Sequence, residues 1–317
     1  MRVLITGGAG FIGAWTGKAL RERGDEVIAV DDFSETIYGA SLKEARAKEL
    51  LKGAEIVRMN ILDAVQFSAL VQETRPDFIV HLAAIAGIRY AQKDPHAVMR
   101  VNVEGTVAAF EAARAAGVKR VVYASSSSVY GTNTKTPFQE DDPVLLPVSH
   151  YAASKRACEL LAEVYRATAG IASTGIRFFT AYGPWGRPDM AYFSFTRALF
   201  EGKTIALYAE GKAGRDFTSV HDIVRGVCAV IDNPVRECSM LNLGNSHPVT
   251  NGTLLSVLET ITEKKARVEM KPLPPEDVPL TYADIIRAKE LFGWEPEIKL
   301  EDGLKEFVEW YRQYHEL

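Results

Sequence analysis

Cysteine is scarce in this sequence, and the few that occur form no pattern. Cys158, Cys228 and Cys238 are odd in number and lack the spacing of metal ligands. The sequence therefore predicts neither a disulfide framework nor a metal site. A chain with so few cysteines is typical of a reducing, cytoplasmic compartment.

Long apolar runs and blocks of like charge are also missing. No segment approaches the roughly 18 consecutive apolar residues that span a bilayer, and the formal net charge is -4 over 317 residues. Because Met1 is followed at once by an apolar stretch, we expect no signal peptide before the fold. These absences argue against a membrane or a nucleic acid as the main partner.

Short apolar stretches alternate with helix-like segments through the first 180 residues. We expect strands over residues 3–6, 26–30, 55–58, 77–82, 120–124 and 172–179, and helices over residues 11–23, 64–73, 95–116 and 151–168. This alternation predicts an α/β fold of the Rossmann type, a doubly wound parallel sheet with helices on both faces. In such sheets, ligands bind beyond the carboxyl ends of the strands.

The character of the chain changes after about residue 181. The loop-like stretches "YGPWGRPDM" and "KPLPPEDVP" separate further helical segments, expected over residues 193–201, 222–233, 251–262 and 303–314. We expect a smaller C-terminal α/β lobe that binds the substrate. The predicted division is a cofactor domain of residues 1–180, with returns over about 217–246, and a lobe of residues 181–216 and 247–317. His221 and Asp222 are interpreted as helix caps rather than catalysts.

A glycine-rich turn follows the first expected strand. Gly8, Gly10 and Gly13 form G-x-G-x-x-G, and Gly7 begins an overlapping G-x-x-G-x-x-G. Such glycines let backbone amides approach a pyrophosphate at a helix N-terminus, although a turn without a ligand is the alternative. Asp31 ends the next apolar run, where a carboxylate accepts hydrogen bonds from ribose hydroxyls and repels a 2′-phosphate. The pattern predicts a dinucleotide site that takes NAD rather than NADP.

A tyrosine and a lysine stand one helical turn apart in "SHYAASKRACELLA". Tyr151 and Lys155 are i and i+4, and so they share one helical face. An ordinary tyrosine, with a pKa of about 10, is a poor base at neutral pH. A neighbouring ammonium and a positive nicotinamide favour its phenolate. With a serine from the strand end "YASSSSVYG" to relay or orient the proton, the pair predicts acid–base chemistry; ordinary helix surface is the alternative.

Eight motifs occur in order along nearly the whole chain: "TGGAGFIG", "HLAA", "NVEGT", "SSSSVYG", "YAASK", "RFFTAYGP", "RDF" and "NLGNSHPV". Together they resemble the extended short-chain dehydrogenase/reductase family, in its nucleotide-sugar epimerase branch. The resemblance implies Tyr151 as the base, Lys155 as a ribose ligand that tunes the pKa of Tyr151, and Ser126 as the catalytic hydroxyl. Ser127 and Ser128 are close rivals for that last role. It also implies NAD contacts from Gly7, Gly10, Phe11, Ile12, Gly13, Asp31, Asn60, Ile61, Leu82, Ala83 and Ala84, with Asn102 in a structural or cofactor role.

Within that branch, "RFFTAYGPWGRPDMAYFSFTRAL", "TYADI" and "FVEWYRQY" resemble the group that acts on UDP-glucuronate. Thr180 stands where UDP-glucose 4-epimerases have asparagine. The resemblance implies reversible C4 epimerisation to UDP-galacturonate through a 4-keto intermediate, with transient hydride transfer to bound NAD. It implies Arg187 as a bidentate clamp on the sugar carboxylate, assisted by Thr180 and a strand-end serine. Arg215 is implied as a diphosphate ligand, with a salt bridge to Asp216 as the alternative.

Other functions stay open at this point: a UDP-glucose 4-epimerase, a UDP-glucuronate decarboxylase, or a catalytically silent protein that binds NAD. The intact Ser126, Tyr151 and Lys155 set argues against the last. The chain departs from the group pattern at Ile85, where glutamine is usual, and in the loop of residues 274–278, where a glutamate would repel a diphosphate unless it points away. The family pattern also implies a homodimer through the helices around residues 95–116 and 151–168.

Overall fold

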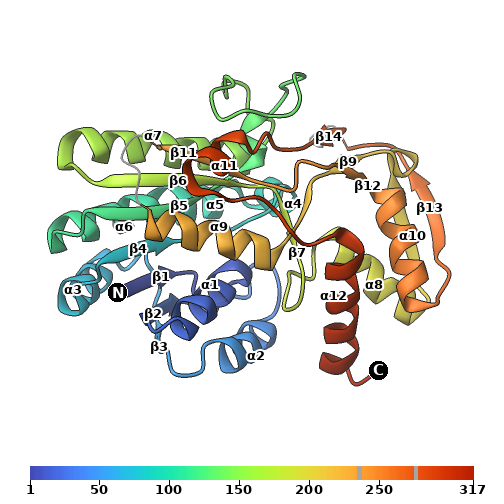
Figure 1. Ribbon diagram of the computed structural model, residues 1–317, viewed down its shortest axis with the longest axis horizontal. Helices are drawn as coiled ribbons and strands as arrows, with labels where there is room; N and C mark the ends of the chain where they lie inside the picture. The colour runs from blue at the N-terminus through green and yellow to red at the C-terminus, as the bar shows by residue number, and fades with distance from the viewer. Residues whose placement is uncertain (234–237, 275–277) are drawn as a thin grey trace.

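A computed structural model describes residues 1–233, 238–274 and 278–317. Within them, seven parallel strands form one sheet in the order β11-β6-β5-β4-β1-β2-β3 (Figure 1). The strands are β1 (Arg2–Thr6), β2 (Glu26–Asp31), β3 (Glu55–Arg58), β4 (Phe78–His81), β5 (Arg120–Ser126), β6 (Ala172–Phe178) and β11 (Met240–Leu243). The predicted doubly wound parallel sheet is confirmed. The order reverses between β1 and β4, which opens a crevice at their carboxyl ends.

Helices cover both faces of the sheet, so both faces are apolar. Leu4 of β1 packs in the cluster beneath α3 (Ala64–Thr74), α6 (Gly105–Ala116) and α7 (His150–Ala169), whereas Val3 and Ile5 pack beneath the opposite layer. This alternation follows the two-residue period of a strand. The opposite layer contains α1 (Phe11–Glu22), α2 (Ala40–Leu50), α9 (Val220–Asp232) and α11 (Ile286–Phe292) (Figure 1).

The single helix expected over residues 95–116 is divided in the structure. It consists of α5 (Pro95–Met99), a π-helical turn (Arg100–Glu104) and α6, and the short α4 (Ile88–Lys93) precedes it. The side chain of Asp94 caps α5 by accepting a hydrogen bond from Ala97 N at 2.9 Å. The wide turn contains Asn102, whose side chain bonds to the loop after β4, and π turns of this kind occur frequently at functional sites.

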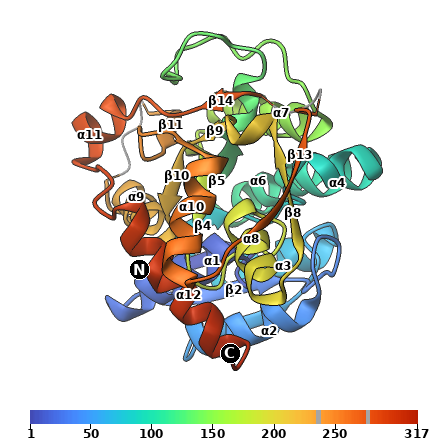
Figure 2. The same cartoon turned by 90° about the vertical axis from the view of Figure 1, so that its right-hand side faces the viewer.

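The smaller lobe lies at one end of the sheet, and Figure 2 turns it toward the viewer. Tyr192, Leu254 and Phe307 belong to its aromatic-rich core. Its main elements are α8 (Ala191–Glu201), β8 (Thr204–Tyr208), α10 (Asn251–Thr262), β13 (Arg267–Lys271) and α12 (Leu300–Tyr314). The short pairings are β7 (Thr180–Tyr182) with β10 (Phe217–Ser219), and β9 (Gly214–Arg215) with β12 (Val249–Thr250) and β14 (Leu280–Thr281). No helix in the described ranges is long and apolar enough to cross a membrane.

Candidate active site

The glycines between β1 and the first turn of α1 stand where a side chain would collide with the protein. Gly7 has φ = +67°, and a Cβ there would lie 2.7 Å from Ala83 N. A Cβ on Gly13 would lie 2.2 Å from Gly7 O, the same oxygen that accepts a hydrogen bond from Gly10 N at 2.9 Å. Helix α1 begins at Phe11, and its first N–H groups have no acceptors within the helix. A turn whose glycines allow this close backbone packing, next to free helix-end amides, fits the pyrophosphate of a dinucleotide.

Asp31 ends β2 beside this turn, and its carboxylate is buried. It accepts hydrogen bonds from Ala9 N at 3.1 Å and Phe33 N at 2.8 Å, and Lys43 Nζ lies 3.4 Å away. The backbone of the glycine turn therefore holds the carboxylate in place. A fixed acceptor at the end of the second strand fits the ribose hydroxyls of NAD.

Other predicted cofactor residues flank the same turn. Residues 82–84 follow β4 and are half-buried. Leu82 N donates to Thr6 O at 3.0 Å, and Ala83 N donates to Thr6 Oγ1 at 3.2 Å. The Phe11 side chain packs on Val220 and Val224 of α9, with Ile12 beside it. The Phe11 side chain is therefore taken up by the contact of α1 with α9.

Asn60 and Ile61 follow β3. Asn60 is exposed, its Nδ2 donates to Asp32 Oδ2 at 3.5 Å, and its Oδ1 accepts from Leu62 N at 2.9 Å. The Ile61 side chain is buried in the core cluster, so close to α6 that a Cβ on Gly105 would lie 2.7 Å from it. Of this pair, Asn60 alone presents its side chain for an adenine.

The serines at the end of β5 divide between core and crevice. Ser125 Oγ donates to the buried Glu159 at 2.6 Å. Ser126, the next residue, points to the other face by the alternation of the strand. Its Oγ accepts from Ser128 N at 3.2 Å and so caps the 3₁₀ turn Ser127–Tyr130. Ser127 and Ser128 are half-buried in that turn.

Helix α7 places Tyr151 and Lys155 one turn apart beside β5. Ser149 caps the helix by accepting a backbone N–H at 3.1 Å, so Tyr151 lies in the first turn. Lys155 is buried, and its Nζ donates to Ala124 O at 2.9 Å, two residues before Ser126. The three predicted catalytic residues therefore come from two adjoining elements at the carboxyl edge of the sheet.

Asn102 has all of its side-chain polar groups engaged by the protein. Its Oδ1 accepts from Ile85 N at 2.8 Å, and its Nδ2 donates to Ile85 O at 3.1 Å and to Ser154 Oγ at 2.9 Å. Ser154 Oγ in turn donates to Tyr151 O at 2.7 Å. This geometry supports the structural one of its two expected roles, tying the loop after β4 to the helical turn that bears Tyr151.

A buried histidine connects the strand ends. His81 Nδ1 lies 2.8 Å from Thr6 Oγ1, and its Nε2 lies 3.3 Å from Thr106 Oγ1, which itself donates to Asn102 O at 2.6 Å. Burial, with a smaller effect of the Lys155 ammonium, lowers the pKa of His81 to about 3. The imidazole is therefore neutral in the folded protein at physiological pH.

His81 makes the protein less stable in acid. Between about pH 6.5 and pH 3 the unfolded chain binds a proton at this site and the folded chain does not, so the free energy of unfolding falls as pH falls. From pH 7 to pH 5 this effect amounts to about 2 kcal/mol. We expect urea unfolding to show the stability difference between wild type and H81N changing by that amount over this interval. Parallel stability curves for the two proteins would contradict it.

The loop of residues 183–190 carries Arg187. Its Nε and Nη2 form a two-pronged pair with Asp189, at 3.0 and 2.6 Å, and Nη2 also donates to Ala86 O at 3.0 Å. Burial lowers the pKa of Arg187, but Asp189 and the phenols of Tyr151 and Tyr38 raise it further, so the net shift is upward. The fork expected to hold a substrate thus faces Asp189, and within the described residues Nη1 has no acceptor.

The same loop packs against the last long helix. The Trp185 ring lies 5.1 Å from that of Trp310 and 5.3 Å from that of Tyr314, both in α12. Trp185 also has φ = +63°, the left-handed conformation that non-glycine residues rarely adopt. Helix α12, which lies more than a hundred residues later in the sequence, therefore supports the strained backbone at Trp185.

Thr180 and Arg215 lie on the short strands that join the two lobes. Thr180 of β7 is half-buried, and its N donates to Asp216 O at 3.0 Å. Arg215 of β9 donates from Nη1 to Gly214 O at 2.8 Å. The Asp216 carboxylate accepts backbone N–H groups of residues 245, 246 and 283 at 2.7–3.1 Å. Asp216 therefore organises neighbouring loops.

The expectation that His221 and Asp222 cap a helix is wrong in detail. Helix α9 begins earlier, and its cap is Ser219, whose Oγ accepts from His221 N at 3.3 Å. Asp222 is buried and accepts N–H groups of Glu297 and Ile298 at 3.2 and 3.0 Å, so it fastens the chain that leads to α12. His221 Nε2 lies 2.9 Å from Glu306. Neither contacts the predicted catalytic residues.

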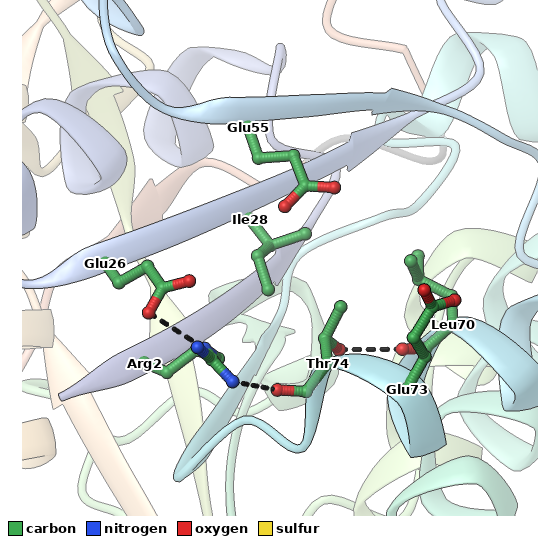
Figure 3. A pocket seen from close by; sticks show the side chains of 7 residues that line it. All are labelled: Arg2, Glu26, Ile28, Glu55, Leu70, Glu73 and Thr74. Atoms are coloured by element: carbon green, nitrogen blue, oxygen red, sulfur yellow. Dashed lines mark hydrogen bonds and ion pairs between the residues drawn. The ribbon is translucent and has the colours of Figure 1, made fainter.

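A hollow of about 230 Å³ lies at the opposite edge of the sheet (Figure 3). Arg2 stands in it, paired with Glu26 at 2.9 Å and donating to Thr74 O at 2.7 Å. Arg2, Glu26 and Glu55 are the first residues of their strands, so the hollow is at the amino ends, away from the glycine turn. Its lining is Arg2, Glu26, Ile28, Glu55, Leu70, Glu73 and Thr74.

This fold and these residues define an extended short-chain dehydrogenase/reductase. A sequence model of the NAD dependent epimerase/dehydratase family matches residues 3–244, and the chain belongs to this family. UDP-glucuronate 4-epimerase 2 of Arabidopsis thaliana is 42% identical to it over 331 residues, which cover 99% of this chain and 76% of that relative. The resemblance expected from the sequence motifs is confirmed.

Solved structures give the same fold. The UDP-glucuronic acid 4-epimerase of Bacillus cereus, in complex with UDP-glucuronic acid and NAD, matches with a TM-score of 0.92 at 31% identity, covering 99% of this chain and all of that one. The UDP-glucose 4-epimerase of Thermotoga maritima, solved with UDP-glucose, matches with a TM-score of 0.91 at 30% identity and the same coverage. Two solved structures with almost the same similarity to this chain were thus determined with different UDP-sugars.

Two residues of this site were missed by sequence reasoning. Asp189 follows Arg187 by two positions, and the alternating charges of "GRPDM" were a usable signal for the pair. Arg46, which lies in α2, contacts both the glycine turn and the loop of residues 183–190. No local motif marks it, because its partners lie far away in the sequence.

Proposed function

We propose that the protein interconverts UDP-glucuronate and UDP-galacturonate at C4, with NAD as its cofactor. The observation that carries this proposal is the 42% identity, over 99% of the chain, to UDP-glucuronate 4-epimerases. The Bacillus cereus neighbour, solved with UDP-glucuronic acid and NAD, supports both ligands. UDP-glucose is the second candidate substrate, because a UDP-glucose 4-epimerase has nearly the same TM-score.

The glycine turn would hold the diphosphate of NAD, and Asp31 would hold a ribose. Residues 82–84 would line the rest of the cofactor, with Asn60 near the adenine. When bound, NAD would supply the acceptor for the hydride of C4 and the donor that returns it to the opposite face. The net reaction therefore consumes no oxidant or reductant.

Tyr151 takes the proton of the C4 hydroxyl as the 4-keto sugar forms, and returns a proton when the alcohol is restored. Lys155 is buried one turn further along α7, on the helix face that bears Tyr151. Ser126, from the end of β5, orients the hydroxyl, with Ser127 and Ser128 close by in the following turn. Asn102 keeps the Tyr151 turn in register through Ser154.

Epimerisation at C4 requires a fixed nucleotide and a sugar that can turn over. Arg215 is our candidate for the diphosphate, because a guanidinium matches phosphate oxygens. In the loop of residues 274–278, a glutamate would repel a diphosphate unless it points away, and positions 275–277 of this loop lie outside the described residues. We assign the cofactor to residues 1–180 with returns over about 217–246, and the nucleotide sugar to residues 181–216 and 247–317.

Oxidation at C4 makes UDP-glucuronate a β-keto acid, which loses CO2 when the carboxylate bond aligns with the carbonyl π system. An epimerase must therefore hold the carboxylate out of that alignment. Arg187 can do so through Nη1, because Asp189 and Ala86 fix the rest of its guanidinium. Thr180 and a strand-end serine complete the proposed contacts.

Proton NMR of UDP-glucuronate with the pure protein tests the proposal directly. UDP-galacturonate signals that approach a constant ratio are the expected result, first without added NAD and then with it. A UDP-pentose product would show a decarboxylase. Turnover of UDP-glucose alone would move the assignment to the second candidate, and no turnover of either sugar would contradict both.

We further propose a homodimer through the helices around residues 95–116 and 151–168, which are α5, α6 and α7. Leu160 and Val164 lie one turn apart on α7 and are 54% and 53% exposed, and Met99 of α5 is 36% exposed. Apolar side chains that share a face in this way favour burial against a second copy.

A cytoplasmic location remains a prediction from the sequence, in keeping with three thiols that form no disulfide.

Replacing Leu160 by glutamate is expected to convert the dimer to a monomer, because it places a charge in an apolar interface. Light scattering at micromolar concentration would then change from twice 34.9 kDa to 34.9 kDa. Ile286→Glu is the matched control, since Ile286 is 59% exposed on α11, in the helix layer on the opposite face of the sheet. A wild-type protein that is already monomeric would contradict the dimer.

A further inference from the structure

Arg46 bridges two loops of the site with one buried guanidinium. It extends from α2 and has no exposed surface. Nη1 donates to Ala9 O, in the glycine turn, at 2.7 Å. Nε donates to Trp185 O at 2.9 Å, and Nη2 donates to Gly186 O at 3.4 Å. The turn that fits a pyrophosphate is thus fastened directly to the loop that bears Arg187.

The acceptors of this cation are neutral. They are the three carbonyl oxygens above and Tyr38 OH, which lies 3.1 Å from Nη1. Burying a charge without an opposite charge is unfavourable, even when hydrogen bonds satisfy its donors. An apolar side chain at such a position often gives a fold that is as stable as, or more stable than, the one with the buried charge. Fold stability alone therefore does not account for Arg46, whereas a role in joining the two loops does.

A second side chain braces the same loop. Trp15 of α1 donates from Nε1 to Pro184 O at 2.9 Å. The consecutive carbonyls of Pro184, Trp185 and Gly186 are therefore all held by donors from the cofactor half of the protein. Because Trp185 has a left-handed backbone, this path of the chain needs such external support.

We propose that Arg46 is a positioning residue that couples the glycine turn to Arg187. Order at Ala9 fixes the guanidinium, the guanidinium fixes the carbonyls of Trp185 and Gly186, and the following residue is then placed for a sugar carboxylate. The role of Arg187 in this chain of contacts rests on the proposed function; the coupling of the two loops does not. By linkage, a ligand held by the loop also tightens cofactor binding at the turn, with a typical factor of about ten.

Hydrogen exchange of residues 183–190, with and without added NAD, tests the coupling without any turnover. In the wild type, NAD is expected to slow exchange in this loop about tenfold. In Arg46→Met the slowing is lost, while protection in α7 is unchanged. Lys48→Met is the control, because Lys48 is exposed on the same helix and its loss also removes one positive charge.

Steady-state kinetics supply a second readout. Arg46→Met is expected to lower kcat/KM for UDP-glucuronate about 100-fold, chiefly by raising KM, because misplacement of a binding group by about 1 Å has effects of this size. Arg46→Lys, which keeps the charge but lacks the planar fork of the guanidinium, is expected to recover about tenfold. A purely structural role would instead lower the unfolding midpoint and leave KM unchanged.

A folded Arg46→Met protein with wild-type NAD-dependent slowing in residues 183–190 would overturn the coupling. If Arg46→Met does not fold, Trp15→Phe tests the same brace, since it removes the bond to Pro184 O and keeps an aromatic ring at this position. It too is expected to reduce the slowing. If wild-type protein shows the slowing but does not turn over UDP-glucuronate, the proposed function fails and the coupling stands.

Discussion

Replacement of Tyr151 by phenylalanine is expected to lower kcat for UDP-glucuronate roughly a thousandfold. The change removes one oxygen atom, the proposed proton acceptor, and general acid–base groups typically contribute factors of 10² to 10⁴. Ring packing beside Ile85 is preserved, since the phenyl ring occupies the same space. The expected result is therefore loss of rate with little change in the unfolding midpoint or in NAD binding. The measurement is the initial rate of UDP-galacturonate formation by NMR.

Tyr165→Phe is the matched control for that experiment. Tyr165 lies on the same helix, but its ring stacks on Phe110 at 5.0 Å in the core beside α6. We expect this variant to keep the wild-type rate within a factor of about two. If Tyr151→Phe retains more than a tenth of the activity, another group removes the proton, and Tyr151 is misassigned.

Replacement of Arg187 by methionine is expected to change both substrate preference and product. A hydrogen bond to a charged group contributes about 1.5–3 kcal/mol, so KM for UDP-glucuronate should rise about 10- to 100-fold, while turnover of UDP-glucose, if any, is nearly unaffected. With the carboxylate released, part of the β-keto acid loses CO2. The measurement is the ratio of UDP-pentose to UDP-galacturonate by NMR.

Arg114→Met is the control for the loss of an arginine. Arg114 lies on α6, is 57% exposed and pairs with Glu111 of its own helix. It is expected to leave both KM and the product ratio unchanged. A folded Arg187→Met protein with a wild-type product ratio would mean that other side chains restrain the carboxylate.

Most of the sheet was predictable from the sequence, because a parallel strand covered on both faces is a short apolar run. The strand over residues 55–58 has the predicted bounds, and the strand expected over residues 26–30 extends by one residue to Asp31. The residues at the strand ends were predictable for a chemical reason. A phosphate requires a glycine turn, and a proton acceptor requires a tyrosine with a nearby cation.

Helix α2 was missed, and the reason is physical. In its sequence "ASLKEARAKEL" the buried positions are Leu42, Arg46, Ala47 and Leu50, so a charged residue stands in the middle of the buried face. The apolar period that predicts a helix is broken there. Natural chains break local rules of this kind where function requires it. Arg46 therefore has two effects: it breaks the apolar period that would have predicted α2, and it makes the contacts proposed to join the two loops.

The partners of the site residues were not predictable. Arg46 and Trp185 are 139 positions apart, and Trp15 and Pro184 are 169 positions apart. Such contacts follow from the sheet order and from the path of the returning chain, and no local pattern encodes them. Residues 95–116 are divided by a π turn that contains Asn102, and no local pattern predicts the bond of this side chain to Ile85, 17 positions earlier.

The packing of Trp185 on Trp310 and Tyr314 also sets an order of events during synthesis. A ribosome adds about 5–20 residues per second, so roughly 6–25 s separate the two tryptophans as the chain emerges. The glycine turn and the strands around it are complete before that interval ends. A nascent chain therefore has the glycine turn and its neighbouring strands first, and the aromatic support of its substrate loop comes last, when α12 has emerged.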